Sequence, residues 1–215
     1  MKAFVNGAAS LSHRSIQRCC SLFSTKNGPS GETVPIETDR LILRPWKETD
    51  AEKLYEYAKN PLVGPMAGWP AHTSVECSLQ IIQNGLSAKG SYAITLKGED
   101  FAIGGIRLMT GADSNLHIGC REAEIGYWLG VPHWGQGIMP EAAREVMRYA
   151  FDKLDISAIW CGYFVENEKS KRVTEKCGFL FHHTEYEKEY PYINAVKTQQ
   201  ITRITKKEWL ASLNP

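Results

Sequence analysis

The sequence lacks the features that mark several classes of protein. Its six cysteines form no C-x-x-C pair, its longest apolar runs are too short to span a bilayer, and its net charge is only +1. His182 and His183 have no cysteine or carboxylate at metal-ligand spacing. We therefore expect no disulfide framework, no metal site, no membrane association and no nucleic-acid partner. The cysteine usage favours a reducing, cytoplasmic compartment.

Acidic residues are missing from the start of the chain, where Glu32 is the first. The 31 residues before it contain four basic residues and many serines, but no apolar core of a secretory signal. This composition is typical of an organellar transit peptide, a disordered tail, or a start codon placed too early. We assign residues 1–36 to an N-terminal extension and 37–215 to one domain. The expected location is the cytoplasm, or an organelle if the extension is a transit peptide.

From residue 37 the spacing of apolar residues becomes regular and predicts alternating secondary structure. Strands are predicted at 40–46, 91–97, 101–109, 122–130, 157–165, 179–190 and 196–204. Helices are predicted from 49 to 60, from 73 to near 85 or 90, from 140 to 154, from about 167 to 177, and after 205. Strands interleaved with a few helices, including a hairpin around "GED", indicate a mixed α/β fold.

Three helix starts carry the pattern of a capping box, in which a hydroxyl residue is followed three positions later by glutamate. The pairs are Thr49 with Glu52, Thr73 with Glu76, and Thr205 with Glu208. Pro140 suits the first turn of its helix, and Gly178 is placed to end the helix that begins near Asn167.

The segment "HWGQGIMPEA", residues 133–142, places two glycines directly before a helix. Glycines let the backbone approach a ligand closely, and the unpaired N–H groups of a helix start attract anions. The loop is therefore a candidate phosphate site, although a plain strand-to-helix turn explains an isolated G-x-G as well. It lacks the G-K-[ST] of a nucleotide P-loop, and Pro140 stands where a dinucleotide fingerprint needs its third glycine.

Three separated segments resemble the GNAT superfamily of acetyl-CoA-dependent N-acyltransferases. The loop aligns with the family pattern [Q/R]-x-x-G-x-[G/A] over residues 134–139. The downstream family pattern N-x-x-[A/S]-x-x-x-Y-x-K-x-G-F is met by five residues: Asn167, Ser170, Lys176, Gly178 and Phe179. The segments "ETDRLILRPWKETDAEKL" and "EIGYWL…HWGQGIMPEA" resemble the branch of the ribosomal-protein alanine N-acetyltransferases. That branch also holds enzymes acting on amino acids, antibiotics and small amines.

The resemblance implies an α+β domain with a mixed, mostly antiparallel sheet of about seven strands and helices on both faces. The fourth and fifth strands should splay apart. Acetyl-CoA is the implied cosubstrate, with no metal, and a monomer or homodimer is expected. The backbone of Leu129 and Val131 should meet the pantetheine arm, with the Leu129 N–H facing the oxyanion. The implied pyrophosphate contacts are Trp134, Gly135, Gln136, Gly137, Ile138 and Met139, and Asn167 and Ser170 are further cofactor contacts.

Transfer of an acetyl group to an amine needs a group that removes the amine's proton. In histone-type members of the family, a glutamate placed like Glu124 does this, usually through water. A surface or cross-strand ion pair is an equally open interpretation of Glu124. Glu122 lies on the same strand face and is the nearest rival, whereas the helix dipole explains Glu141 more simply.

The leaving thiolate benefits from a proton donor, and here the chain departs from the family. Thr174 stands at the position of the frequent family tyrosine, and threonine donates a proton poorly. Ser170, one helical turn earlier, is the better candidate for contact with the thiol. Alternatively no side-chain acid is needed, because a thiolate leaves easily. Asn167 is expected to bind the pantetheine arm, to cap its helix, or to do both.

The acceptor amine should enter between the loop at 61–72 and the turn at 191–195. Trp69, His72, Tyr190 and Tyr192 are candidates to line its pocket, although aromatic loop residues often only pack. The sequence therefore predicts an N-acetyltransferase for a primary amine, on a protein N-terminus or a small molecule. The alternative is a catalytically weak acyl-CoA sensor or scaffold. A hydrolase is disfavoured because the chain has no G-x-S-x-G elbow.

Overall fold

The computed structural model describes residues 33–213, which form one sheet with helices packed on it. The strands are β1 (Ile36–Glu37), β2 (Leu41–Arg44), β3 (Ser91–Leu96), β4 (Gly104–Thr110), β5 (Glu122–Leu129), β6 (Ala158–Phe164), β7 (Leu180–Tyr190) and β8 (Ala195–Thr205). The α-helices are α2 (Ala51–Ala58), α3 (Val75–Ile81), α4 (Ile138–Lys153), α5 (Glu168–Lys176) and α6 (Lys206–Leu213). The shorter helical turns are η1 (Glu48–Asp50), η2 (Pro65–Ala67), η3 (Ile82–Leu86), η4 (Gly111–Asp113) and η5 (Val131–His133).

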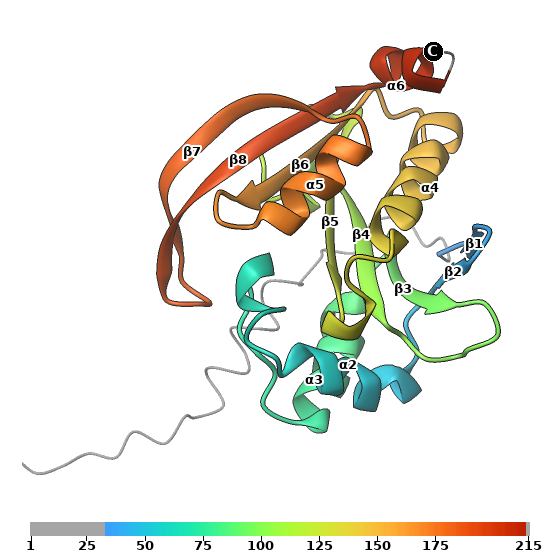
Figure 1. Cartoon of the computed structure of the whole chain (residues 1–215), viewed down its shortest axis with the longest axis vertical. Helices are drawn as coiled ribbons and strands as arrows, with labels where there is room; N and C mark the ends of the chain where they lie inside the picture. Colours follow the sequence, from blue (N-terminus) through green and yellow to red (C-terminus); the bar gives the residue numbers. More distant parts are fainter. Residues whose placement is uncertain (1–32, 214–215) are drawn as a thin grey trace, which may run out of the picture.

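The eight strands follow the order β1-β2-β3-β4-β5-β6-β8-β7. Every neighbouring pair is antiparallel except β5 and β6. These two strands pair only over Glu122–Glu124 with Ala158–Trp160, so the remainder of β5 runs away from β6 (Figure 1). The predicted splay between the fourth and fifth strands is thus confirmed. It is the fifth and sixth in the structure, because short β1 raises the predicted seven strands to eight.

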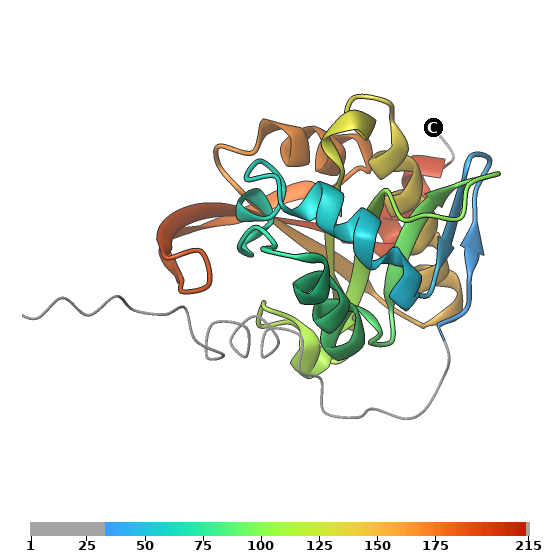
Figure 2. The same ribbon diagram turned by 90° about the horizontal axis from the view of Figure 1, so that it is seen from below.

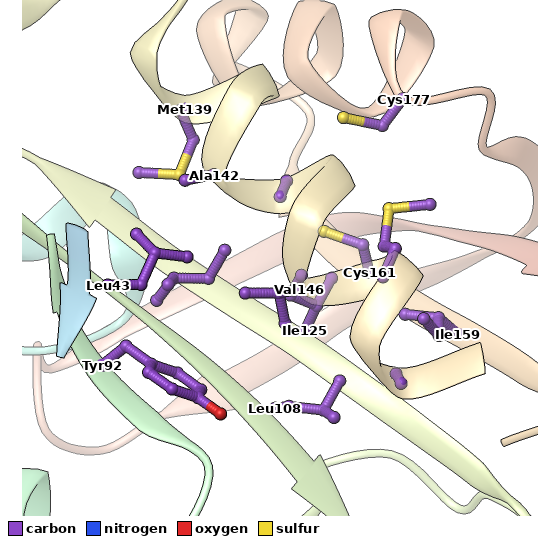
Figure 3. Packing of buried hydrophobic residues seen from close by; sticks show 14 of the residues in the cluster. Leu43, Tyr92, Leu108, Ile125, Met139, Ala142, Val146, Ile159, Cys161 and Cys177 are labelled. Atoms are coloured by element: carbon purple, nitrogen blue, oxygen red, sulfur yellow. The ribbon is translucent and has the colours of Figure 1, made fainter. Parts of the chain in front are cut away.

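Helices cover both faces of the sheet, as predicted, because alternate residues of each strand point to opposite faces. Apolar residues of α4 pack on one face, where Ala142 and Val146 point toward Ile125 of β5 (Figure 3). A second core lies between α2, α3 and the opposite face, and it includes Leu54 and Ile82. Figure 2 shows α4 and α5 on one side of the sheet and α3 on the other.

The helix starts differ in part from the predicted capping boxes. The first helix begins with η1, where the Asp50 carboxylate accepts the Lys47 N–H at 2.9 Å, so the box at Thr49 is wrong. The second helix starts one residue later than predicted, because Ser74 rather than Thr73 accepts the Cys77 N–H at 3.1 Å. Short polar side chains compete for these positions, and the local turn decides between neighbours.

The third capping box is confirmed before α6. The Thr205 hydroxyl accepts the Glu208 N–H at 3.2 Å, and the Glu208 carboxylate accepts the Thr205 N–H at 2.7 Å. Asn167 caps α5, and Gly178 follows that helix with φ of 82°, as predicted. Helix α4 begins at Ile138, two residues before the predicted start, and keeps Pro140 in its first turn.

Most of the predicted extension, residues 1–32, lies outside the described residues, and the sheet begins at Ile36. Within 33–213, no helix is both long and apolar enough to cross a bilayer. No three cysteine, histidine or acidic side chains gather there as ligands for a metal ion. The four cysteines in this part of the chain are free thiols: Cys77, Cys120, Cys161 and Cys177.

Candidate active site

Two glycines shape the loop that precedes α4. Gly135 and Gly137 have φ of 77° and 75°, in the left-handed region that L side chains rarely adopt. Gly137 is the N-cap of α4, which is 16 residues long. The first N–H groups of a helix have no partner within it and carry the positive end of its dipole. The loop therefore directs backbone donors outward in the manner of an anion site.

Two cationic side chains, which were not predicted from the sequence, flank this loop. The Lys169 ammonium lies 4.6 Å from the centroid of the Trp134 ring, and the Arg40 guanidinium donates to the Gln136 carbonyl at 3.1 Å. Lys169 comes from the first turn of α5, two residues after Asn167, which is a signal that the sequence did contain. Arg40 lies 96 residues before Gln136, so only the fold reveals it.

Glu141 joins α4 to the segment between β1 and β2. Its carboxylate accepts the Thr38 hydroxyl at 2.5 Å and the backbone N–H of Arg40 at 3.1 Å, and it pairs with the Arg40 guanidinium at 2.6 Å. Burial opposes ionisation of this carboxyl, but these bonds leave the pKa of Glu141 below its ordinary value. Glu141 therefore holds Arg40 beside the glycine loop.

Two backbone carbonyls between β5 and the glycine loop already accept hydrogen bonds from within the protein. The Trp134 indole donates to the Leu129 carbonyl at 2.8 Å, and the Trp134 N–H donates to the Val131 carbonyl at 3.2 Å. Val131 begins η5 and does not extend the strand. The backbone of Leu129 and Val131 was predicted from the sequence to contact the cofactor arm. The carbonyls of both residues already accept hydrogen bonds from Trp134. The Leu129 N–H remains the candidate donor, because alternation along β5 turns it toward β6.

Glu124 lies on β5 at its last bridge to β6, opposite Trp160. Its side chain is buried with 8% of its surface exposed. The carboxylate accepts the Ser114 hydroxyl at 2.8 Å and the Asn115 N–H at 2.6 Å. Both donors come from the segment between β4 and β5, and the sequence interpretation missed them. A buried carboxylate is thus held in a fixed orientation at the point where the two strands separate.

Glu122, the rival carboxylate on the same face, is engaged elsewhere. It accepts the Trp160 indole N–H and the Gly119 N–H at 3.0 Å each, and it pairs with Arg203 at 3.3 Å. These contacts tie the beginning of β5 to β6 and β8. The geometry therefore favours Glu124 over Glu122 as the group that faces the strand opening.

On the opposite face of β5, the Tyr127 side chain reaches α5. Its hydroxyl lies 2.9 Å from Oγ of Ser170 and 3.9 Å from the Cys161 sulfur on β6. Burial raises the pKa of Tyr127 well above its ordinary value, so the phenol is protonated. The sequence interpretation missed this tyrosine, because a strand residue facing a core resembles simple packing.

Thr174, which stands at the family's tyrosine position, is buried and donates its hydroxyl to the Lys171 carbonyl at 2.8 Å. Asn167 performs the capping role predicted for it, since its Oδ1 accepts the Ser170 N–H at 3.1 Å. Its amide also donates to the Met66 carbonyl at 3.3 Å, which connects α5 to the loop at 61–72. Asn167 therefore fixes the start of the helix that carries Ser170.

The sequence and the fold agree with known acetyltransferases. A family model described as an acetyltransferase (GNAT) domain matches residues 40–180. The chain belongs to the GNAT family. The uncharacterized N-acetyltransferase YoaA of Bacillus subtilis is 32% identical over 149 residues, covering 67% of this chain and 81% of YoaA. The family resemblance seen in the sequence is thereby confirmed, and the chain is an N-acetyltransferase by membership.

Two solved structures share the GNAT fold. The ribosomal-protein-S5-alanine acetyltransferase of Vibrio fischeri has a TM-score of 0.60 at 21% identity, covering 82% of this chain and 98% of that one. The microcin C7 self-immunity acetyltransferase MccE, in complex with acetyl-CoA and AMP, has a TM-score of 0.64 at 22% identity. The match covers 78% of this chain and 93% of the MccE chain. At these sequence identities, the similarity to the two structures establishes the fold alone.

Two of the predicted acceptor residues lie in the packed core of this GNAT domain. Trp69 packs between Trp128 and His72, with ring centroids 6.0 and 5.1 Å away. His72 is buried, its Nδ1 lies 2.8 Å from the Ser78 hydroxyl, and burial lowers its pKa to about 4. For His72 the packing alternative is therefore the correct one, and Trp69 reaches the site only through its contact with Trp128.

The two segments expected to flank the acceptor do meet. A methyl group on Gly68 would lie 3.6 Å from the Tyr190 ring, which itself packs edge-on against Phe164 at 4.8 Å. Figure 1 shows the loop after α2 beside the end of the β7–β8 hairpin. The Tyr190 hydroxyl donates to the Gln199 side chain, and Tyr192 lies half-buried in the turn at 191–194. The fold thus brings these tyrosines to the same end of the sheet.

Proposed function

We propose that this GNAT enzyme transfers an acetyl group from acetyl-CoA to a primary amine by direct attack in a ternary complex. The acceptor is a small molecule or a protein N-terminus. One observation carries the proposal: a buried carboxylate, Glu124, is held by two donors where β5 and β6 separate. A carboxylate fixed beside an opening between strands is suited to remove a proton from an amine bound there, directly or through water.

Acetyl-CoA fits the donor groups of the loop. The outward N–H groups near Gly135, Gly137 and the first turn of α4 suit the pyrophosphate, and Arg40 and Lys169 add positive charge on either side. The arm of the cosubstrate would then pass Leu129 and enter the opening between β5 and β6. Trp134, Gln136, Ile138 and Met139 complete the proposed contacts, with Val131, Asn167 and Ser170 beside the arm.

The chemical step follows from groups on both faces of β5. Glu124 accepts the amine's proton, and the nitrogen forms a bond to the thioester carbonyl carbon. The Leu129 N–H stabilises the oxyanion, and the carbon–sulfur bond then breaks. The Tyr127–Ser170 pair donates a proton or a hydrogen bond to the departing sulfur, which Thr174 cannot reach. Direct attack is favoured because burial raises the pKa of the nearby Cys161 thiol to about 12, which disfavours an acetyl-cysteine intermediate.

The test combines binding and turnover. Acetyl-CoA affinity is measured by calorimetry, and release of free CoA thiol is followed with a panel of primary amines. Glu124→Gln should lower kcat at least about 100-fold and leave the acetyl-CoA Kd within about twofold. Glu122→Gln is the matched control, on the same strand face but bound to Trp160, and it should keep most of kcat.

The outcomes separate the alternatives. Tight acetyl-CoA binding without turnover of any amine, unchanged in Glu124→Gln, would identify an acyl-CoA sensor instead of an enzyme. A larger loss in Glu122→Gln than in Glu124→Gln would reassign the base. Absence of acetyl-CoA binding would refute both the catalytic and the sensor function.

A further inference from the structure

Arg107 occupies a position on β4 beside the proposed base. In the β4–β5 register it lies opposite Gly126, and Glu124 and Trp128 are the next residues of β5 on the same face. Diagonal neighbours of this kind have Cα atoms about 7–8 Å apart, within reach of long side chains. The face is the one that packs against α2 and α3, since neighbouring Gly105 contacts Trp46 and Trp128. Arg107 and Glu124 therefore flank one patch of the sheet.

Within the described part of the chain, the charge of Arg107 has no carboxylate partner in direct contact. Among residues 33–213 its guanidinium forms no ion pair within 4.0 Å, and its buried Nε has no hydrogen-bond partner. Arg44 and Arg203 also have an unpartnered Nε, but their guanidinium groups pair with Asp50 and Glu122 at 2.7 and 3.3 Å. Among residues 33–213, Arg107 thus differs from the other two arginines with a buried Nε in lacking its own counter-ion.

Burial lowers the pKa of Arg107, and the carboxylates of Asp113 and Glu124 counter this only from a distance. The Asp113 segment, between β4 and β5, lies on the α3 side of the sheet, in yellow-green in Figure 2. A half-buried guanidinium without a close partner is unfavourable, and a ligand carboxylate can bind it with two parallel hydrogen bonds. The Arg107 guanidinium is therefore suited to bind an anionic ligand.

Gly126 leaves room for such a ligand. It stands between Glu124 and Trp128, and a methyl group at Gly126 would approach only the Met109 side chain, at 3.3 Å. The patch therefore has the Gly126 backbone and the flexible Met109 side chain at its floor, with a negative group on one side and a positive group across from it. A molecule that carries an ammonium and a carboxylate a few bonds apart matches this pair of charges.

We propose that the acceptor carries a carboxylate close to its reactive amine, and that Arg107 binds this carboxylate while Glu124 receives the amine's proton. The inference rests on the proposed acetyl transfer and narrows its acceptor. Two sources share this chemistry: a free amino acid and a peptide whose first residue is acidic. Arg107 is then a specificity-determining residue, and removing its charge should abolish the preference for acids over amides.

The experiment uses acceptor pairs that differ only in charge: glycine with glycinamide, and peptide amides beginning with Asp or Asn. The full-length wild-type enzyme should prefer one of the acids over its neutral partner by about tenfold or more in kcat/KM. The pair showing the preference identifies the source. In Arg107→Gln the ratio should fall to about one, and in Arg107→Lys it should be intermediate, because lysine keeps the charge but not the paired geometry.

Arg203→Gln is the matched control and should leave the ratio unchanged, since Arg203 pairs with Glu122. A ratio of two rates is independent of the folded fraction, so a less stable variant still gives an answer. If Arg107→Gln lowers both rates equally, Arg107 acts only on Glu124 and the proposal is wrong. Equal use of acids and amides by the wild type also overturns it, whereas no acetylation of either refutes the proposed function itself.

Discussion

The Tyr127 hydroxyl on β5 lies 2.9 Å from Oγ of Ser170 on α5, the helix that follows β6. Tyr127 is half-buried, its raised pKa keeps it protonated, and either hydroxyl can donate to the other. The pair joins two elements that the proposed cosubstrate must pass between. In the proposed reaction this pair supplies a proton from a position that the family's tyrosine pattern does not include.

Tyr127→Phe should lower kcat about tenfold, less than a typical general acid, because thiolates leave readily. Steady-state kcat at saturating acetyl-CoA and amine is the measurement, with acetyl-CoA binding checked separately. Thr174→Val is the control: its hydroxyl is bound to the Lys171 carbonyl, so its loss should reduce stability by about 1 kcal/mol and leave kcat within about twofold. A greater loss of kcat in Thr174→Val would assign the donor to Thr174 after all.

Gly137→Ala should weaken acetyl-CoA binding about tenfold, because a Cβ in the left-handed region costs about 1–2 kcal/mol and the loop can relax by turning its N–H groups away. Calorimetric titration with acetyl-CoA measures the Kd. Gly98→Ala is the matched control, since Gly98 has φ of 89° in the hairpin between β3 and β4. It should lose similar stability without any change in Kd, and equal effects on Kd in both variants would contradict a binding role for the loop.

The sequence predicted the elements that repeat a local pattern. Alternating, β-rich or continuously apolar runs predicted seven of the strands, and helical spacing predicted α4 and α5, with Asn167 and Gly178 at the ends of α5. Helix N-caps were predicted less well. Thr49 was predicted where the Asp50 carboxylate binds the Lys47 N–H, and Thr73 where Ser74 caps α3, because only the local turn distinguishes such neighbouring polar residues. Strand β1 was not predicted, because it has two residues and only one of them, Ile36, is buried.

The candidate site was predictable only where a motif lies within one segment. Gly137, Glu124 and Ser170 lie in such segments, and we propose that they act at one strand opening. Ser114, Arg40 and Arg107 were missed because the residues beside which they lie, Glu124, Gln136 and Gly126, are on other elements of the chain. His72 illustrates the opposite error: a histidine beside a tryptophan in a Gly- and Pro-rich loop suggested a pocket, but the loop folds inward against α3.

Asp50→Ala should destabilise the domain by about 3–5 kcal/mol. The Asp50 carboxylate is fully buried and binds the buried Arg44 guanidinium through two bonds of 2.7 and 2.8 Å. Its removal leaves this buried charge with the exposed Asp100 carboxylate, at 3.2 Å, as its remaining ion-pair partner among residues 33–213. Urea unfolding gives the change in unfolding free energy. The exposed pair Lys53–Glu56 is the comparison, and Glu56→Ala should change that free energy by less than about 0.5 kcal/mol. Similar losses in the two variants would show that burial does not decide the outcome.

Acidification should destabilise the protein through His72. Burial lowers the folded-state pKa of His72 to about 4 from its ordinary value of 6.5, so between these values the unfolded chain binds a proton that the folded chain does not. The stabilising contribution is therefore complete above pH 6.5 and is lost as the pH falls toward 4. It amounts to about 3 kcal/mol at most.

Unfolding free energies from urea titrations between pH 7 and 4 measure this effect. Carboxylates also titrate in the lower part of this range, so the informative quantity is the difference between the wild type and His72→Gln. Because glutamine does not titrate, the variant should lose less stability than the wild type as the pH falls, even though it starts from a lower value at pH 7. Parallel pH curves for the two proteins would mean that His72 titrates alike in the folded and unfolded chains, and that the segment around His72 is open to water.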